Sequence, residues 1–526
     1  MEIKKEYTPG RAEQLYVRLE PLRQPYLDRA RECAKYTIPS LMPPLGIHST
    51  TKLPTPYQGV GARGVNNLAS KLLLVLLPPN SPFFRLMVDE FSENHFIDAA
   101  HKTAIETALG KIERGVMGEI ETSSDRVSTF EALKHLLVVG NCLAYMPKGD
   151  SMQVFHLDRY VIKRDPMGKV LHIVTKETID YTALPEEVLK LLPNEPEYSP
   201  EGSTKERSCE IYTHLYRDKN RWRLYQEIQG ILIPNSVSSF QFDKCPYIPL
   251  RYTKIDGEDY GRSFVDEYLG DLKTLEGLTK AVTEGAAAAA KILFLVNPNG
   301  TTRLKTIAEA PNCAIREGNA EDVTILQSNK FYDFKTASER MDKIEERLSY
   351  AFMLNSSIQR QGERVTAEEI RYMAAELEDS LGGLYSILSQ EFQLPYVNRK
   401  MAQMQASGKL PPLPKGVIKP SIITGLEALG RGQDLNKLDL FISGMAQTLG
   451  PEALAQYMNI GEYIARRATA LGIDTEGLIR SEEEVQASQA QAQQQAMLSQ
   501  FGPEVIKQAG PLIQKGMENA NGTEAA

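Results

Sequence analysis

Residues 337–351 repeat apolar side chains at steps of three and four, the spacing that places them on one face of an α-helix. The apolar positions are Ala337, Met341, Ile344, Leu348 and Ala351. The opposite side carries Glu339, Asp342, Lys343, Glu345 and Glu346. The pattern predicts a long amphipathic helix with a heavily charged face.

A second helical pattern precedes it, from Phe264 to Lys291, with Pro298 expected to stop it. At 1.5 Å per residue, this segment predicts a rod about 40 Å long. Between the two rods, residues 297–331 contain glycine, proline and the short strand pattern Val323–Leu326. We therefore expect two long helices with a small module inserted between them.

A short polar loop follows the second rod, with the sequence QRQGER from Gln359 to Arg364. Thr366 lies three residues before Glu369, the capping-box spacing, so a further helix is expected to begin near Thr366. The glycine of the loop permits rearrangement, and its two arginines could reach a phosphate. The residues alone are better explained by an ordinary exposed loop.

The N-terminal third is predicted to be mostly helical, with patterns from Gln14 to Tyr36 and from Gly64 to Leu77 joined by a proline-rich extended connection. A further helical pattern, residues 130–138, ends at Gly140 and Asn141, which suit the left-handed position that closes a helix.

The middle of the chain is predicted to mix helices with strands. Val154–Leu157 and Val170–Val174 are expected to form a hairpin around the turn at residues 165–168. A second pair, Glu210–Tyr216 and Trp222–Ile228, is expected around a polar turn.

Composition excludes several classes of protein. Sixty basic and 68 acidic residues give a net charge of -8, the wrong sign for a broad surface that grips phosphates, although ordinary solubility explains the balance equally well. Five widely spaced cysteines without a C-x-x-C pair argue against disulfides or zinc. The apolar run Leu68–Leu77 is too short for a bilayer, and the N-terminus lacks a secretory pattern, so the chain is expected to stay in the cytoplasm where it is made.

Motifs for catalysis are also missing. Gly59, Gly61 and Gly64 have the G-x-G-x-x-G spacing, but prolines instead of a strand precede them, so a flexible turn with Arg63 in a structural contact is the preferred interpretation. There is no Walker A loop and no nucleophile elbow. The seven histidines are scattered, and no two of them form the i, i+4 histidine pair that, with a glutamate, binds zinc in helical zinc proteases. We expect no metal, no cofactor and no enzymatic activity.

Collinear strings along the chain resemble a known family. Around the loop these are AFMLNS from Ala351, GERVTAEEIRY from Gly362, ELED from Glu376 and YSILSQE from Tyr385. Elsewhere they are YTIPSL from Tyr36, VGARGVNNLASKL from Val60, DGEDYGRS from Asp256, EYLGDL from Glu267, LVNP from Leu295 and GLEALGRGQD from Gly425. Together they resemble portal proteins, the head-to-tail connectors of short-tailed bacteriophages (podophages of the autographivirus type), over roughly residues 15–474.

The resemblance implies a predominantly α-helical α+β fold that assembles as a ring around a central channel. The implied parts are a wing (1–259), a first stem helix (260–294), a clip (295–332), a second stem helix (333–354), a tunnel loop (355–366), a wing helix returning to the crown (367–430), crown helices (431–480) and a Gln/Ala-rich tail, marginally helical or disordered (481–526).

The resemblance also implies a function and partners. The ring, of twelve subunits in the family, would occupy one capsid vertex of the virion as the channel for packaging, retention and ejection of double-stranded DNA. Partners would be terminase, capsid and scaffolding protein, a tail adaptor and possibly internal core proteins. The loop residues Gln359, Arg360, Gly362, Glu363 and Arg364 become candidates for a DNA valve, and an acidic balance would keep friction with sliding DNA low.

Two other functions remain open at this stage. One is a nucleotide-dependent enzyme that uses the turn at Gly59, and the other is a tail or adaptor protein that forms a ring without packaging DNA. The long stalk helices with their inserted module favour the portal over an adaptor.

Overall fold

The computed structural model describes residues 10–46, 52–79, 83–88, 99–149, 151–192, 208–289, 293–311, 313–326, 331–354, 387–411, 418–422, 442–445 and 447–448. The chain divides into two units, Met1–Leu426 and Glu427–Ala526. In the second unit the structure describes only short helical pieces, at residues 442–445 and 447–448.

The main helices of the first unit are α1 (Arg11–Lys35), α2 (Val60–Leu76), α4 (Ala99–Thr122), α5 (Asp125–Val139), α8 (Leu269–Ala289), α10 (Phe331–Ala351) and α13 (Leu394–Ala406). Shorter ones are α6 (Glu186–Leu189), α7 (Phe264–Glu267), α9 (Leu304–Ala308) and the π-helical turn η6 (Ser389–Gln393). Helices therefore predominate over strands among the described residues, as the sequence predicted.

The largest sheet is antiparallel, with the order β4-β5-β6-β7-β8, and β9 also pairs with β7. Its strands are β4 (Tyr160–Arg164), β5 (Val170–Asp180), β6 (Ser208–Asp218), β7 (Arg221–Ile228), β8 (Ile231–Leu232) and β9 (Ser238–Phe240). The predicted pair around residues 217–221 is confirmed as the β6–β7 hairpin, whose two-residue turn places Lys219 at φ 43°.

The predicted hairpin around Asp165 was wrong in one of its strands. The turn is present, with the Gly168 amide donating to the Asp165 carbonyl at 2.8 Å, but it joins β4 to β5. Val154 belongs to β3 (Gln153–Phe155), which pairs with β2 (Asn141–Tyr145) in a separate sheet of order β10-β2-β3, where β10 is Tyr247–Arg251. Strand β4 is buried on both faces, so it lacks the alternation that identifies a strand from sequence.

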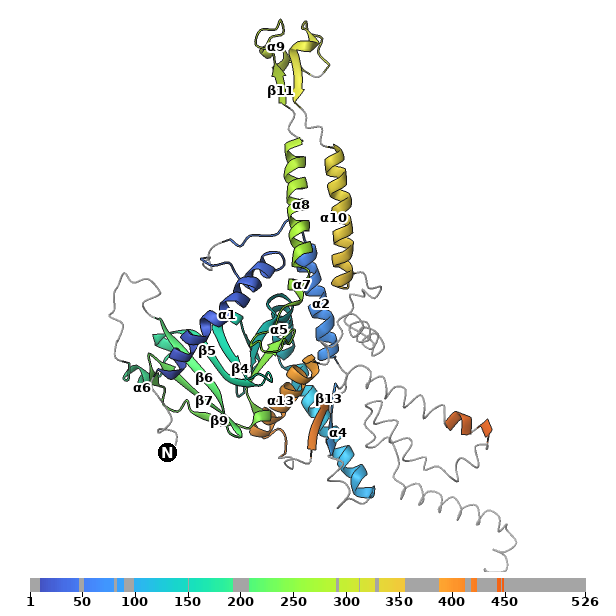
Figure 1. Ribbon diagram of the computed structural model, residues 1–526. Helices are drawn as coiled ribbons and strands as arrows, with labels where there is room; N and C mark the ends of the chain where they lie inside the picture. Colours follow the sequence, from blue (N-terminus) through green and yellow to red (C-terminus); the bar gives the residue numbers. More distant parts are fainter. Residues whose placement is uncertain are drawn as a thin grey trace, which may run out of the picture. The chain divides into compact units, whose positions relative to one another are not determined.

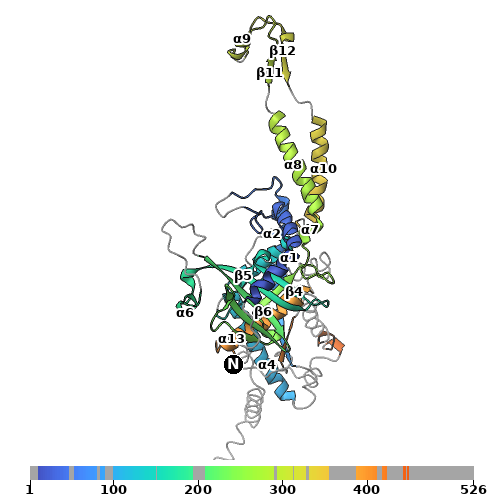
Figure 2. The same cartoon turned by 60° about the vertical axis from the view of Figure 1, so that its left-hand side comes forward.

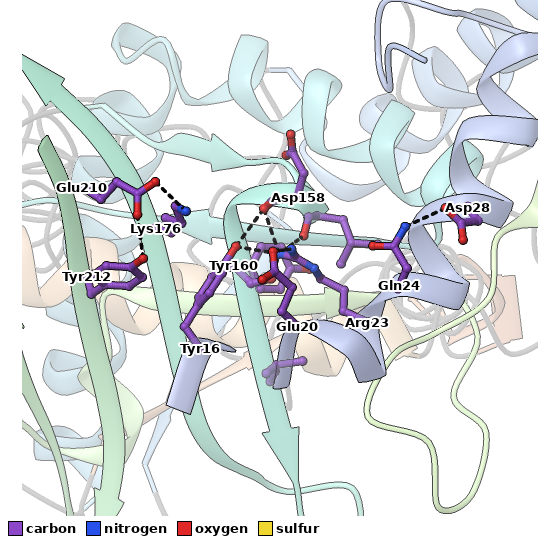
Figure 3. A network of polar contacts seen from close by, with 12 residues as sticks. Tyr16, Glu20, Arg23, Gln24, Asp28, Asp158, Tyr160, Lys176, Glu210 and Tyr212 are labelled. Carbon is purple, nitrogen blue, oxygen red and sulfur yellow. Dashed lines mark hydrogen bonds and ion pairs between the residues drawn. The ribbon is translucent and has the colours of Figure 1, made fainter. Parts of the chain in front are cut away.

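Helix α1 packs on the large sheet through Leu15, Tyr16 and Leu19, which form a core with Val161 and Val174 (Figure 1). Figure 3 shows how Arg23 fixes this helix in place. Its buried guanidinium donates from Nη1 to the carbonyls of Leu157, Asp158 and Tyr160 at 2.8–3.0 Å. The charge is thus satisfied by the chain segment that leads into β4, since a buried cation needs such partners.

Helices α2, α5 and α13 share the main hydrophobic core with the β10-β2-β3 sheet. Helix α5 ends as predicted, because Gly140 adopts φ 81° and its amide donates to the carbonyls of His135 and Leu136. Strand β1 (Phe84–Val88) pairs with β13 (Ile418–Ile422), which joins distant parts of the sequence.

The predicted rod Phe264–Lys291 is two helices, since the chain breaks at Tyr268 between α7 and α8. Pro298 does not end it either, because α8 stops at Ala289 and strand β11 (Leu293–Val296) follows. β11 pairs with β12 (Val323–Leu326), which confirms the small module between the rods. Figures 1 and 2 both show α8 and α10 side by side.

Candidate functional site

The helix pair α8–α10 is held by an apolar seam and by charges at its edge. Ile344 and Leu348 of α10 are buried in the same core as Leu272 and Leu275 of α8. Arg347 Nη2 lies 2.7 Å from Asp271 Oδ1 across the pair. The predicted apolar face of residues 337–351 is therefore confirmed as the packing face.

Close contact along the pair depends on a glycine of α8. A Cβ at Gly285 would lie 2.7 Å from two ring atoms of Phe334, so a larger side chain there would push the helices apart.

The remaining surface of α10 is exposed and carries both signs of charge. Its exposed charged residues are Asp333, Lys335, Glu339, Arg340, Asp342, Lys343, Glu345, Glu346 and Arg347. Four are basic and five acidic, so the face is densely charged and nearly balanced. Such a face would attract a polyanion only weakly.

The C-terminal end of α10 is fastened to α2. Met353 takes the left-handed conformation at φ 54°, and the Leu354 amide donates to the Ser349 carbonyl at 2.8 Å, which closes the helix. Asn67 Nδ2 donates to the carbonyls of Phe352 and Met353 at 3.1 Å. The buried ammonium of Lys71 also donates to Met353 O at 3.1 Å. The residues that precede the predicted loop are thus fixed by side chains of α2.

The chain is fastened to α2 again where it returns at residue 387. Gln393 Nε2 donates to the Leu76 carbonyl at 2.7 Å. Nearby, Arg251 Nη2 of β10 lies 2.9 Å from Glu391 Oε1. Both ends of the interval 355–386 therefore attach to the same helix.

The predicted valve residues lie inside that interval. Gln359, Arg360, Gly362, Glu363 and Arg364, together with the helix start at Thr366, are outside the described residues. The structure describes the two attachments of the segment.

The sequence predicted a flexible turn at Gly59, Gly61 and Gly64, and this prediction was wrong. Gly59 precedes α2, and Gly61 and Gly64 lie buried within it. A Cβ at Gly61 would lie 2.5 Å from the Tyr36 carbonyl oxygen, and one at Gly64 would lie 2.4 Å from Phe352 Cγ. At Gly61 and Gly64 the space that a phosphate would need is filled by this chain itself, so these two glycines permit close packing of α2.

One cluster of metal-ligating residues escaped the sequence analysis. Glu131, His135 and His156 each offer a ligand atom, and these atoms lie within 4.8 Å of one another. The i, i+4 spacing of Glu131 and His135 on a predicted helix was an available signal, whereas nothing local pointed to His156. Burial, followed by the nearby charges of His156 and Lys134, lowers the pKa of His135 to about 3, so its imidazole is neutral.

Comparison with known proteins decides the family. Residues 10–479 match the model of the family described as bacteriophage head to tail connecting protein. The chain belongs to this family of phage portal proteins. It is 43% identical to the portal protein of Escherichia phage T7 over 92% of this chain and 91% of the relative. The portal proteins of Enterobacteria phages T3 and SP6 are 44% and 32% identical, covering 90% and 96% of this chain and 89% and 96% of theirs.

A solved neck of a native GTA particle is also similar, at 12% identity over 79% of this chain and 90% of that one, but its TM-score of 0.33 carries no argument. Portal proteins are structural and not enzymes, which removes the nucleotide-dependent enzyme from the alternatives. No helix in the described part of the chain is long and apolar enough to cross a membrane.

Proposed function

We propose that this chain assembles into a closed ring of twelve subunits at one vertex of a phage capsid, where it forms the channel for packaging, retaining and ejecting double-stranded DNA. The observation that carries the proposal is the 43% identity to a portal protein across 92% of the chain, which supports the same role for this chain. An adaptor is less well supported, since the match spans the helix pair and its inserted module.

The helix pair α8–α10 supports a role as the stem. A ring that closes by rotation requires two different complementary faces on each subunit. Large apolar side chains are exposed on the single chain at Tyr332 and Tyr350 of α10, 81% and 82% exposed, and at Ile315 of the inserted module, 99% exposed. A neighbouring subunit would remove these surfaces from water.

The balanced charges of α10 suit a wall along which DNA slides. Each phosphate neutralised by lysine or arginine adds affinity that must be broken before the duplex can move. A face with nearly equal numbers of acidic and basic side chains keeps that affinity low while remaining hydrated.

Residues 355–366 would form the tunnel loop, with Gln359, Arg360, Gly362, Glu363 and Arg364 at the channel. The attachments of Phe352 and Met353 to α2 support this role because they would hold the start of the loop still. The arginines would act as a valve that grips phosphates after filling.

The other parts follow the family plan. Residues 295–332 would form a clip that docks terminase during packaging and the tail adaptor afterwards, and the wing would contact capsid, scaffolding and internal core proteins. Residues 431–480 would form the crown and 481–526 a tail. The subunits would be made in the host cytoplasm and finish in the virion.

The assembly is tested by native mass spectrometry of the full-length chain. Twelve copies of the 58.7 kDa subunit predict a particle of about 700 kDa. A discrete ring mass supports the proposal, and a stable monomer at all concentrations, with and without scaffolding protein, contradicts it.

The valve is tested with the double variant Arg360→Ala/Arg364→Ala. We expect normal ring assembly but loss of DNA from filled heads. The matched control is Arg159→Ala/Arg221→Ala, which removes two exposed arginines elsewhere. Equal DNA retention in both variants would remove the valve role.

A further inference from the structure

A cluster at the edge of the main core has the composition of a metal site. Glu131 and His135 lie one turn apart on α5, and His156 lies between β3 and the 3-10 turn Leu157–Arg159. Two imidazoles and one carboxylate form a donor set that first-row divalent transition metals favour, while magnesium and calcium prefer oxygen ligands alone.

The burial of His135 distinguishes this cluster from an ion pair at the surface. Its side chain is fully buried, and neither ring nitrogen has a hydrogen-bond partner. Leaving a buried polar group without a partner destabilises the fold, so native proteins usually supply one. Its ring centroid lies 4.3 Å from that of His156, with the rings at 73°.

His156 is oriented as a ligand would be. Its Nδ1 lies 3.4 Å from the Leu41 carbonyl, which favours the tautomer with the proton on Nδ1. The lone pair then resides on Nε2, which lies 3.9 Å from Glu131 Oε1. Metal-bound histidines characteristically donate their other ring N–H to such a carbonyl.

The separations are compatible with closure around an ion. Ligands about 2.0–2.1 Å from a tetrahedral zinc lie roughly 3.3 Å apart, while the three atoms here lie within 4.8 Å. Glu131 and His156 are partly exposed, with side chains 46% and 33% accessible, so small rotations can bring them inward. Their exposure also leaves a path for the ion and room for water as a fourth ligand.

We propose that Glu131, His135 and His156 bind one divalent transition-metal ion, of which Zn²⁺ is the representative, and that the ion joins α5 to the segment between β3 and β4. The inference does not depend on the proposed ring function. The ion is structural: it supplies His135 with the partner it lacks and cross-links two elements of the core.

The test is a titration of the chelator-treated, full-length chain with Zn²⁺ against a chromophoric competitor, together with Co²⁺ absorption as a report on nitrogen ligation. We expect one ion per chain at this site and a higher melting temperature with Zn²⁺ but not with Mg²⁺. In His156→Gln and Glu131→Gln, both partly exposed positions, affinity should fall at least 10-fold, and the Co²⁺ spectrum should lose intensity.

His172→Gln is the control, since His172 lies in β5 and hydrogen-bonds to His214 at 3.2 Å, outside the cluster. It should bind zinc as the unaltered chain does. The proposal is overturned if the chain takes up no ion, or if the two cluster variants bind zinc with unchanged affinity and stoichiometry, because any ion would then be held elsewhere.

Discussion

Lys400 of α13 places its ammonium nitrogen 2.8 Å from Oδ2 of Asp125 at the first residue of α5, and both side chains are buried. The two residues are 275 positions apart. Tyr396 donates its hydroxyl to the same carboxylate oxygen at 2.8 Å, and the Met152 amide donates to Oδ1 at 2.9 Å. The segment that follows residues 355–386 is thus bound to the core through one satisfied charge.

Replacing Lys400 by methionine should destabilise the chain by about 3–5 kcal/mol, because the Asp125 carboxylate would remain buried without its counter-ion. Urea unfolding at fixed protein concentration measures the change. Lys409→Met is the matched control: its pair with Glu119, at 2.7 Å, is largely exposed and should contribute only about 0–1 kcal/mol. Similar losses in both variants would show that burial of the Asp125 pair has no special effect.

Because the pKa of Asp125 is lowered in the folded chain, we expect the protein to lose stability in acid. Burial alone would raise the pKa of its carboxyl, but the donors Lys400, Met152 and Tyr396 outweigh burial and lower the pKa below the ordinary value. The unfolded carboxyl, with a pKa of about 4, takes up its proton before the native one does. The stabilisation is therefore complete above about pH 4 and disappears as the pH falls through the lower native pKa.

The measurement is the unfolding free energy from neutral pH down to about pH 2, for the unaltered chain and for Asp125→Asn. The asparagine variant should be less stable at pH 7 and lose less stability on acidification. If both chains lose stability in parallel, Asp125 does not contribute to the acid transition.

Gly64→Ala should destabilise the contact between α2 and the end of α10. Its Cβ would meet the Phe352 ring at 2.4–2.8 Å, and overpacking of this kind costs about 1–3 kcal/mol. Gly115→Ala in α4 is the control, because nothing lies within 4 Å of a Cβ there. That exposed helical site should gain about 0.5–1 kcal/mol, so thermal unfolding should shift in opposite directions. A gain in both variants would contradict the packing role of Gly64.

Asn67→Ala should loosen the attachment of α10 to α2. The carbonyls of Phe352 and Met353 would each lose one donor. Two hydrogen bonds of about 1 kcal/mol each stabilise the closed state by about 2 kcal/mol, so their loss should increase local opening, and with it hydrogen exchange, roughly 30-fold. Hydrogen exchange of the Phe352 and Leu354 amides reports this opening. Asn66→Ala, at the neighbouring exposed position, should leave those rates unchanged, and equal rates in both variants would assign the attachment to other contacts.

Local sequence patterns were sufficient to predict the elements whose spacing or turn residues lie within one short segment. The seam of α10, the end of α5 at Gly140 and the β6–β7 hairpin follow from spacing and turn chemistry within a few residues. The family itself followed from strings spread along the chain, which no single motif would have provided.

Pairings between distant segments could not be predicted in this way. Nothing near Phe84 indicates that β1 pairs with β13, because an apolar strand pattern does not determine which other strand it will pair with. The same holds for Asp125 with Lys400, and for His156 beside Glu131 and His135. Strand β4 was missed because it is buried on both faces, and the glycines of α2 were misassigned because their neighbours Tyr36 and Phe352 lie elsewhere in the sequence.

Two of these pairings, β1 with β13 and Asp125 with Lys400, can form only after the later partner has been synthesised. A ribosome adds about 5–20 residues per second, so Lys400 is made roughly 14–55 s after Asp125. Until then the Asp125 carboxylate has no counter-ion and β1 has an open edge. The N-terminal half of a nascent chain therefore cannot complete its core until α13 and β13 have been made.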